Sequence, residues 1–285
     1  MMKNKICLIT GATAGIGLET ARQLAQLGFD IYITGRSEQK STDALQQINL
    51  AAPGKGKGYF VCDFSSQHSI REAAQKIRNT LTELHVLVNN AGAVYQHKEL
   101  TEEGIEKTFA TNHLGYFLLT HLLLPIIPAN QGSRIVNVAS DAHFSGRMNV
   151  EDIVNPKKYF IFQAYANSKL ANVMFTFLLA EKLKPMNITA NCLHPGVVKT
   201  RIGNKNTADW MGWAWNAITM LRGISVEKGA ATSVYLASSD EVSSVSGKYF
   251  DKCRESKPSA LATNASLQQQ LWNLSEKLCG IQSYI

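Results

Sequence analysis

The sequence predicts an α/β protein, a single-domain Rossmann-like doubly wound parallel sheet with helices on both faces. Short apolar runs alternate with longer helix-like segments, and a glycine-rich turn follows the first run. Parallel strands are buried on both faces and read as continuous apolar runs, while their helical crossovers cover the sheet on either side. The expected strands are residues 6–9, 31–33, 59–61, 86–88, 135–138 and 188–193.

Length and composition agree with this architecture. The chain has 285 residues, of which 45% are hydrophobic, so residues 1–285 can form one domain around a large core. The net charge is +7, but Lys157 and Lys158 form the only adjacent basic pair. No basic stripe suits a phosphate backbone, and we expect no nucleic-acid partner.

Cysteine usage and hydropathy point to the cytoplasm. The five cysteines are far apart and lack CxxC spacing, so neither a disulfide framework nor a zinc site is predicted. The first apolar run is too short for a signal peptide. The longest apolar region, 116–127, is too short for a transmembrane segment, which needs about 20 residues.

Two helices can be read directly from their apolar stripes. The first follows the glycine-rich turn and ends before Gly28, and the second lies in the C-terminal tail, residues 253–285, and ends before Gly280. We expect this tail to dock on the body of the protein. The stripes consist of Leu18, Ala21, Leu24, Ala25 and Leu27 in the first helix and Leu267, Leu271, Leu274 and Leu278 in the second.

The turn between the first strand and the first helix is a candidate phosphate site. At this junction unpaired backbone N–H groups and a helix N-terminus can meet a dinucleotide pyrophosphate, if glycine allows close approach. Glycines also serve tight turns and close packing, so the turn alone is weak evidence. The candidate cofactor contacts here are Gly11, Thr13, Gly15, Ile16 and Gly17.

The spacing of this turn, Thr-Gly-x-x-x-Gly-x-Gly from Thr10 to Gly17, resembles that of the short-chain dehydrogenase/reductase family. The resemblance extends over nearly the whole chain. It implies an oxidoreductase that transfers hydride to or from a nicotinamide cofactor.

The end of the second strand bears on the choice of cofactor. Thr34-Gly35-Arg36-Ser37 has no carboxylate where NAD-binding units commonly hold the ribose hydroxyls. Arg36 can pair with a 2′-phosphate, assisted by Ser37 or Lys40, so NADP(H) is favoured over NAD(H). The alternative is that Arg36 is a solvated loop residue, and the glycine turn lacks the basic residue of many NADP-preferring relatives.

Further cofactor contacts follow from the resemblance. Asp63 in Cys62-Asp63-Phe64 is expected near the adenine, and the turn after the fourth strand is expected to line the cleft. An aspartate that caps a helix and an Asn-Ala-Gly turn are the structural alternatives. The implied contacts are Asp63, Phe64, Asn89, Ala91, Gly92, Pro195, Gly196, Val198 and Thr200, with Val198 and Thr200 at the nicotinamide carboxamide.

Tyr165 and Lys169 are the candidate catalytic pair. They lie four residues apart at the start of a long apolar helix that reaches about residue 182, and therefore share one helix face. A neighbouring ammonium favours the phenolate and lowers the pKa of a tyrosine, which suits Tyr165 as proton donor and acceptor. The resemblance implies that Lys169 also binds the nicotinamide ribose, that Ser140 bonds the substrate oxygen, and that Asn112 orders a water relay toward the lysine.

The substrate class is indicated by three further stretches. Asp141-Ala142-His143, His194 to Val198 and Leu271 to Leu278 resemble the retinol dehydrogenase subgroup, without the N-terminal membrane anchor of many members. An aromatic segment with Trp210, Trp213 and Trp215 falls in the expected substrate lid, around residues 200–225. A lipophilic carbonyl or alcohol is the expected substrate, although these side chains could instead pack on the core or on a membrane surface. His143 and His194 are expected to hydrogen-bond locally rather than to bind a metal.

Two other functions stay open from the sequence. One is a regulatory protein that binds NADP without turnover, and the other is a light-dependent enzyme resembling protochlorophyllide reductases. The family resemblance also implies a homo-oligomer formed through the helices at 114–124 and 165–183, with the number of subunits undetermined.

Overall fold

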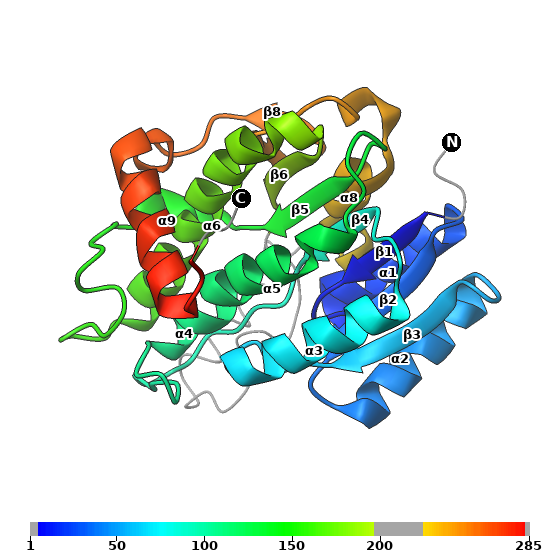
Figure 1. Ribbon diagram of the computed structural model, residues 1–285, viewed down its shortest axis with the longest axis horizontal. Coiled ribbons are helices and arrows are strands. Elements are labelled where there is room, and N and C mark those ends of the chain that lie inside the picture. The colour runs from blue at the N-terminus through cyan, green and yellow to red at the C-terminus, as the bar shows by residue number, and fades with distance from the viewer. Residues whose placement is uncertain (1–4, 197–224, 283–285) are drawn as a thin grey trace.

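The computed structural model describes residues 5–196 and 225–282 and contains an eight-stranded sheet in the order β3-β2-β1-β4-β5-β6-β7-β8 (Figure 1). β1 to β7 are parallel, and β8 is antiparallel to β7. The predicted doubly wound parallel sheet is confirmed. The strands are β1 (Ile6–Ile9), β2 (Asp30–Gly35), β3 (Gly56–Val61), β4 (Val86–Asn89), β5 (Arg134–Val138), β6 (Thr189–His194), β7 (Tyr249–Asp251) and β8 (Arg254–Ser256).

Helices cover both faces of this sheet. On β1, Leu8 belongs to one hydrophobic cluster, whereas Cys7 and Ile9 belong to the other, because successive strand residues point to opposite faces. One face carries α1 (Gly15–Gln26), α2 (Glu38–Ala51) and α8 (Val226–Ser238). The other carries α3 (Gln67–Thr80), α5 (Gly115–Leu123), α6 (Ile161–Leu183) and α9 (Ala265–Cys279), with the three-residue α4 (Lys107–Phe109) before α5 (Figure 1).

The strands β7 and β8 were missed by the sequence reasoning. Each has three residues, which is too short to show a periodic pattern. Lys252 and Cys253 connect them with φ angles of 48° and 59°, the left-handed conformation of a tight hairpin turn. β7 pairs with β6, and Tyr249 and Phe250 are buried, so tertiary contacts define these strands.

The first helix matches its predicted limits, with one correction. Gly28 has φ 95°, a conformation that favours glycine, and it follows the helix end as expected. Leu27, which was assigned to the buried stripe, is 52% exposed. It lies beyond the last helical residue, Gln26, and so no longer follows the helical periodicity that buries Leu24.

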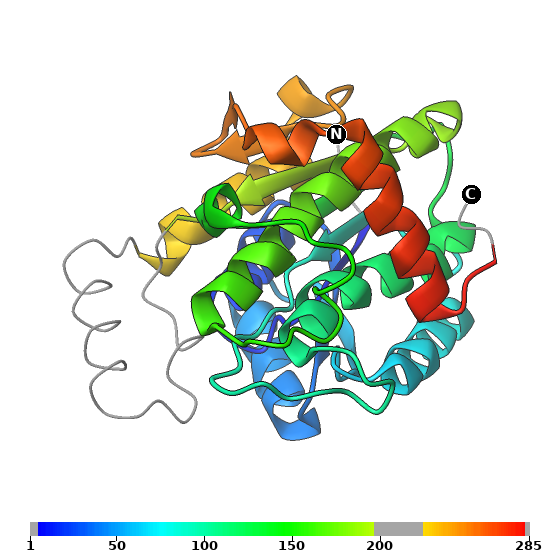
Figure 2. The ribbon, with the colours of Figure 1, turned by 90° about the vertical axis from the view of Figure 1, so that its left-hand side faces the viewer.

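The C-terminal helix α9 packs along α6, as Figures 1 and 2 both show. The ring of Trp272 lies 5.1 Å from that of Phe117 on α5 and 5.9 Å from that of Phe175 on α6, measured between centroids. The helices α5 and α6 contain the segments expected to mediate self-association. Because α9 packs against them, part of the surface of α5 and α6 is already buried within the chain.

No helix within the described ranges is long and apolar enough to cross a bilayer.

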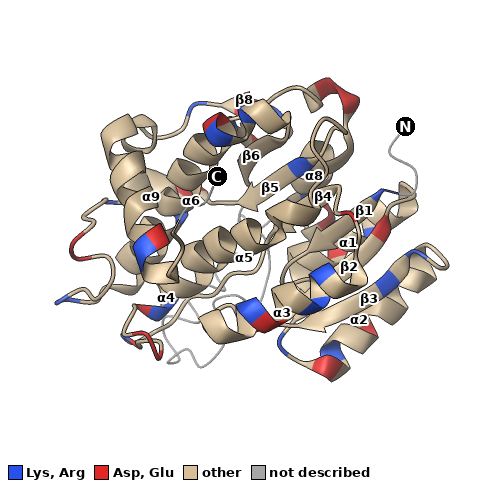
Figure 3. Cartoon of the chain, viewed as in Figure 1, with Lys and Arg blue, Asp and Glu red and all other residues tan. Residues whose placement is uncertain are grey.

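Basic and acidic residues are interspersed over the helices and strands, as Figure 3 shows.

Candidate active site

The predicted site residues gather where the parallel strands end. In a doubly wound sheet the loops after the strands meet at the carboxyl edge, which is where such folds bind ligands. The glycine turn follows β1, Gly92 lies just beyond β4, and Ser140 lies just beyond β5. Tyr165 and Lys169 reach this edge from the second and third turns of α6.

Ser140 contacts Tyr165 directly. It has an extended backbone, with φ −169°, and caps the short 3₁₀ helix Asp141–Ser145 by accepting the N–H of Ala142 at 3.2 Å. Its hydroxyl also interacts with the phenol of Tyr165 and lowers the pKa of that phenol. The structure thus brings together two candidates that are 25 positions apart in the sequence.

Lys169 is almost fully buried beside Tyr165. Its side chain amine, Nζ, donates to the carbonyl of Val138 at 2.9 Å and lies 5.7 Å from the centre of the Tyr165 ring. Burial disfavours a charged amine and lowers the pKa of Lys169 to about 7. The lysine is therefore divided between its charged and neutral forms near neutrality.

The expected effect of Lys169 on Tyr165 is not found. Burial raises the pKa of Tyr165, and the lowering contribution comes from the hydrogen bond with Ser140. Burial lowers the pKa of Lys169 to about 7, so its amine is neutral at the higher pH where the phenol of Tyr165 would lose its proton. The amine is also bound to the carbonyl of Val138. In the free protein Tyr165 is a protonated phenol at neutral pH, which suits a proton donor.

Asn112 lies in a π-helical turn, Ala110–Leu114, between α4 and α5. Such turns are rare and often occur at functional sites. Its side chain accepts the N–H of Ala93 at 2.8 Å and donates to Ser168 of α6 at 3.0 Å. A Cβ at Gly92 would lie 3.4 Å from Asn112 Oδ1 and 3.8 Å from Lys169 Nζ, so the amide and the amine flank this glycine.

Tyr116 is a neighbour of the catalytic pair that sequence reasoning missed. Its ring centre lies 5.9 Å from Lys169 Nζ, so the amine contacts two aromatic rings. Its buried hydroxyl has no hydrogen-bond partner among the described residues, and burial raises its pKa. The spacing of four residues from Asn112 could have indicated that Tyr116 shares the same helix face.

The glycine turn packs closely against the loop after β4. Thr10 Oγ1 accepts the N–H groups of Asn90 and Ala91 at 2.8 and 2.9 Å. A Cβ at Gly11 would lie 2.8 Å from Ala91 Cα, and one at Gly17 would lie 2.7 Å from the Gly11 carbonyl. Two of the three glycines therefore serve packing within the protein as well as any ligand.

The start of α1 nevertheless fits a phosphate group. Gly15 has φ 59°, and the preceding Ala14 supplies no side-chain hydrogen bond to the helix. The N–H groups of a first turn without such a cap are available to an anion. By contrast, side chains cap α2, α3, α8 and α9, namely Ser37, Ser66, Ser225 and Asn264.

Two other predicted residues of this turn contact the protein through their side chains. The methyl group of Thr13 would be 2.4 Å from a Cβ at Gly35, so it lies against the end of β2. Ile16 is buried against Ala230 of α8. Only the backbone of Ile16 remains for a cofactor.

Arg36 follows β2 at the same edge. It is exposed and makes no hydrogen bond or ion pair with another residue in the described part of the chain. Ser37 accepts the N–H of Lys40 at 3.4 Å, so its hydroxyl caps α2. Arg36 thus lies next to the glycine turn with no ion-pair partner among the described residues.

Two predicted cofactor contacts have their side chains in the core. A Cβ at Gly115 would lie 2.7 Å from the ring of Phe64, which packs against α5. Asn89 is fully buried and donates to Thr120 at 3.0 Å and Asn137 at 2.8 Å. Both side chains are directed into the core, which leaves the backbone atoms of these residues for the predicted cofactor contacts.

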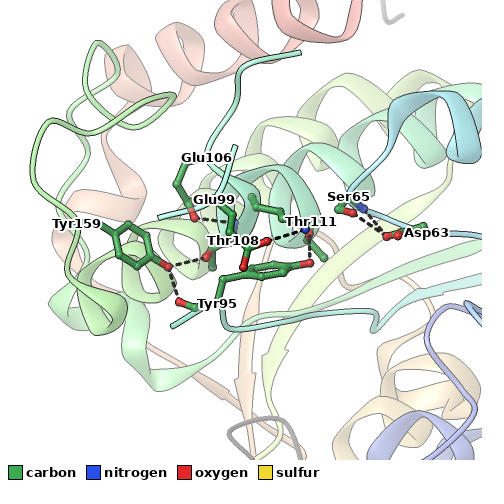
Figure 4. Close-up of polar contacts among 9 residues, drawn as sticks. Asp63, Ser65, Tyr95, Glu99, Glu106, Thr108, Thr111 and Tyr159 are labelled. Atoms are coloured by element: carbon green, nitrogen blue, oxygen red, sulfur yellow. Dashed lines mark hydrogen bonds and ion pairs between the residues drawn. The ribbon is translucent and has the colours of Figure 1, made fainter. Parts of the chain in front are cut away.

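The remaining cofactor candidates lie at loop positions. Asp63 accepts the N–H and hydroxyl of Ser65 at 2.9 and 2.8 Å, which orients one oxygen of its carboxylate (Figure 4). Pro195 and Gly196 follow β6, and Gly196 has φ 83°. Val198, Thr200 and nearly all of the expected lid, 200–224, lie outside the described residues.

The segment between Ser140 and Tyr165 is anchored beside the site. Tyr159 donates to the carbonyl of Tyr95 at 2.6 Å and lies 3.2 Å from the hydroxyl of Thr108, as Figure 4 shows. The buried Glu106 accepts the N–H groups of Thr108 and Phe109 at 2.7 and 2.8 Å. These bonds connect the segment before α6 to the chain that leads into the Asn112 turn.

Comparisons with known proteins agree with this fold. A family model described as short chain dehydrogenase matches residues 5–210. Retinol dehydrogenase 12 of Mus musculus is 37% identical over 278 residues, covering 98% of this chain and 87% of that protein. A crystal structure of an uncharacterized protein from Mycobacterium Paratuberculosis aligns with TM-score 0.78 and 30% identity, over 98% of this chain and 95% of that one. A blue fluorescent protein from a metagenomic library, in complex with NADPH, aligns with TM-score 0.69 and 27% identity, over 87% and 96%.

Proposed function

The chain belongs to the short-chain dehydrogenase family and is an oxidoreductase acting on CH–OH or carbonyl groups, and from this premise we propose that it uses NADP(H) on a lipophilic aldehyde, ketone or alcohol. The observation that carries the proposal is the group formed by Ser140, Tyr165 and Lys169 at the carboxyl edge of the sheet. The uncapped start of α1 at the same edge offers a place for the cofactor pyrophosphate.

The bound nicotinamide supplies or accepts the hydride. In reduction, the phenol of Tyr165 donates a proton to the carbonyl oxygen, and in oxidation it takes that proton from the alcohol. The hydroxyl of Ser140 holds the same oxygen in place. Lys169, with a pKa of about 7, can return a proton to Tyr165 at neutral pH. Asn112 holds the loop after β4 against α6 and so positions the lysine.

Replacing Tyr165 tests the mechanism. Tyr165→Phe retains the ring but loses the proton, and should lower kcat for carbonyl reduction by about 10²–10⁴-fold. Steady-state oxidation of NADPH with a panel of aldehydes and ketones measures this, and an unchanged melting temperature confirms folding. Tyr235→Phe on α8 is the matched control and should keep full activity. Turnover by Tyr165→Phe at the wild-type rate would refute the mechanism.

The NADP(H) preference rests on Arg36. An exposed guanidinium that has no partner among residues 5–196 and 225–282 can bind a 2′-phosphate through charge-assisted hydrogen bonds. The related blue fluorescent protein in complex with NADPH supports this choice. One substitution tests both the preference for NADP(H) and the assignment of Arg36 as the residue that binds the 2′-phosphate.

Arg36→Asp should reverse the cofactor preference, since a carboxylate repels the 2′-phosphate and can hold a ribose hydroxyl. The measurement is kcat/KM for NADPH and for NADH, with one carbonyl substrate. Arg78→Asp, which changes an exposed arginine on α3, should leave the ratio unchanged. A wild-type preference for NADH, or an unaltered ratio in Arg36→Asp, would contradict the assignment.

A lipophilic substrate is supported by exposed aromatic side chains near the site. Phe144, Phe160 and Phe162 are 54%, 65% and 60% exposed, and they flank Ser140 and Tyr165 in the sequence. The likeness to retinol dehydrogenase 12 agrees with such a substrate. The carbonyl panel, graded by chain length, tests it, because kcat/KM should rise as the substrate becomes more apolar.

We place the protein in the cytoplasm as part of the same proposal. All five cysteines are free thiols, and Cys7, Cys62, Cys192 and Cys279 are buried. Buried unpaired thiols are typical of proteins from a reducing compartment.

A further inference from the structure

The peptide bond between Ser140 and Asp141 is held by two histidines. His143 Nδ1 lies 2.7 Å from the carbonyl oxygen of Ser140. On the other side of the same peptide, the N–H of Asp141 donates to His194 Nδ1 at 3.1 Å. His143 is fully buried, and His194 is 7% exposed, so water competes little for either bond.

These contacts define the tautomer of each ring. A carbonyl oxygen can only accept, so His143 Nδ1 carries the hydrogen, and its Nε2 accepts the N–H of Ser259 at 3.1 Å. His194 has the opposite arrangement, because Nδ1 accepts and Nε2 lies 3.0 Å from Asp141 Oδ2. Each ring has one nitrogen that receives a backbone N–H. Both histidines are therefore neutral in this structure.

Two further contacts complete the arrangement. The hydroxyl of Tyr249 donates to Asp141 Oδ1 at 3.0 Å, and the Tyr249 ring lies 4.8 Å from that of His143. The hydrogen bond to His194 lowers the pKa of Asp141, which keeps this carboxylate an acceptor, and burial lowers the pKa of His143. The Ser140–Asp141 peptide is thus connected to β6, β7 and the segment before α9.

We propose that His143 and His194 are positioning residues for Ser140, which hold its peptide from both sides and thereby set its hydroxyl against Tyr165. This inference rests on the proposed function, because it concerns the residue that would bind the substrate oxygen. Neither histidine touches the reacting atoms. A backbone displacement of Ser140 moves its Oγ relative to the phenol, and a misplacement of about 1 Å can cost about 10²-fold in rate.

Leucine and asparagine substitutions separate positioning from simple packing. His194→Leu and His143→Leu remove the ring nitrogens, and each should lower kcat for carbonyl reduction about 10²-fold. The Kd for NADPH should stay unchanged, since Ser140 does not hold the cofactor. His194→Asn keeps an acceptor at the place of Nδ1, and His143→Asn keeps a donor there, so both should recover most of the lost kcat.

His85 provides a matched control at the opposite end of the sheet. Its Nδ1 accepts the N–H of Ile6 at 3.2 Å, and its Nε2 lies 3.5 Å from Glu83, the same pair of contacts that His194 makes. It precedes β4 and is remote from the carboxyl edge. His85→Leu should lower the melting temperature without lowering kcat.

Nitrogen NMR of ¹⁵N-histidine-labelled wild-type protein tests the arrangement even if a variant does not fold. At pH 7.5, His143 should be protonated at Nδ1 and His194 at Nε2. The opposite tautomer in either ring, or an unchanged kcat in either leucine variant, would overturn the proposal. Absence of reductase activity in the wild type would instead refute the proposed function, and the tautomers would still report on the two histidines.

Discussion

Among single residues, Lys169 has a feature that lowers the stability of the folded protein and favours proton transfer, namely a buried amine. An amine buried between Tyr116 and Tyr165 has lost its hydration, and one hydrogen bond to Val138 replaces it. The resulting pKa of about 7 suits proton exchange at neutral pH. In the unfolded chain the Lys169 amine is charged and hydrated. Folding must remove either its proton or its hydration, and this lowers the free energy of unfolding.

Lys169→Met should therefore stabilise the protein while abolishing turnover. The folded pKa of about 7 lies below the unfolded value of 10.5, so between these values only the unfolded chain binds the proton. Wild-type stability should rise as the pH rises through this window, and the variant should lack this rise. At pH 7 the variant should be more stable by about 1–3 kcal/mol, after loss of the Val138 bond is included.

Urea unfolding at pH 7 and pH 9.5 measures the difference. Lys76→Met, at an exposed position of α3, is the control and should show neither effect. If Lys169→Met were less stable than the wild type at pH 7, burial of the Lys169 amine would not lower the free energy of unfolding as proposed.

At the scale of elements, α9 completes the core on its face of the sheet. Trp272 inserts between α5 and α6, and Leu271 is buried beside it. Gly280 ends the helix with φ 60°, and its N–H bonds the carbonyl of Lys277. The C-terminal segment is thus part of the same hydrophobic cluster as the helix that carries Tyr165 and Lys169.

Trp272→Ala should destabilise the protein by about 3 kcal/mol, because it leaves a cavity among Phe117 and Phe175. Activity at 25 °C should persist, since Trp272 packs against Phe117 and Phe175 in the core rather than against Tyr165 or Ser140. Urea unfolding is the measurement, and Leu50→Ala, which changes an 85% exposed side chain, should alter stability by less than about 0.5 kcal/mol. Equal losses in the two variants would argue against a docked α9.

At the scale of the whole molecule, neutral buried histidines make the fold sensitive to acid. Burial lowers the pKa of His85, His113 and His143, and that of His113 falls to about 3. His113 is enclosed by Phe109, Phe117 and Phe175 and bonds Ser275 of α9 at 2.9 Å. Its protonation would place a charge within the core.

Stability should fall as the pH falls from 7.5 to 5.5. Below the unfolded histidine pKa of about 6.5, the unfolded chain takes up protons that the folded protein excludes, at a cost of up to about 1.4 kcal/mol per pH unit for each histidine. Urea unfolding across this range tests the slope. His113→Gln should reduce it, whereas His68→Gln, at an exposed position, should not. A slope that His113→Gln leaves unchanged would exclude His113 as its source.

A feature can be predicted from the sequence when the residues that determine it lie close together along the chain. The six predicted strands appear within a few residues of their expected limits, because a buried parallel strand is a local run of apolar residues. The pairing of Tyr165 with Lys169 is also local, since both lie on one helix. A motif does not show which way a side chain points, and in the folded protein the packing of Phe64 on Gly115 and the hydrogen bond from Asn89 to Asn137 decide this.

The fold class, the candidate phosphate-binding turn and the catalytic candidates could be predicted from the amino-acid sequence, because all of them depend on short spacings along the chain. The low pKa of Lys169, the strands β7 and β8, and the tautomers of His143 and His194 became apparent only in the folded protein. Charge state depends on burial and on hydrogen-bond partners such as Val138 and Ser259, which come from distant segments. Those partners meet only when the chain is folded.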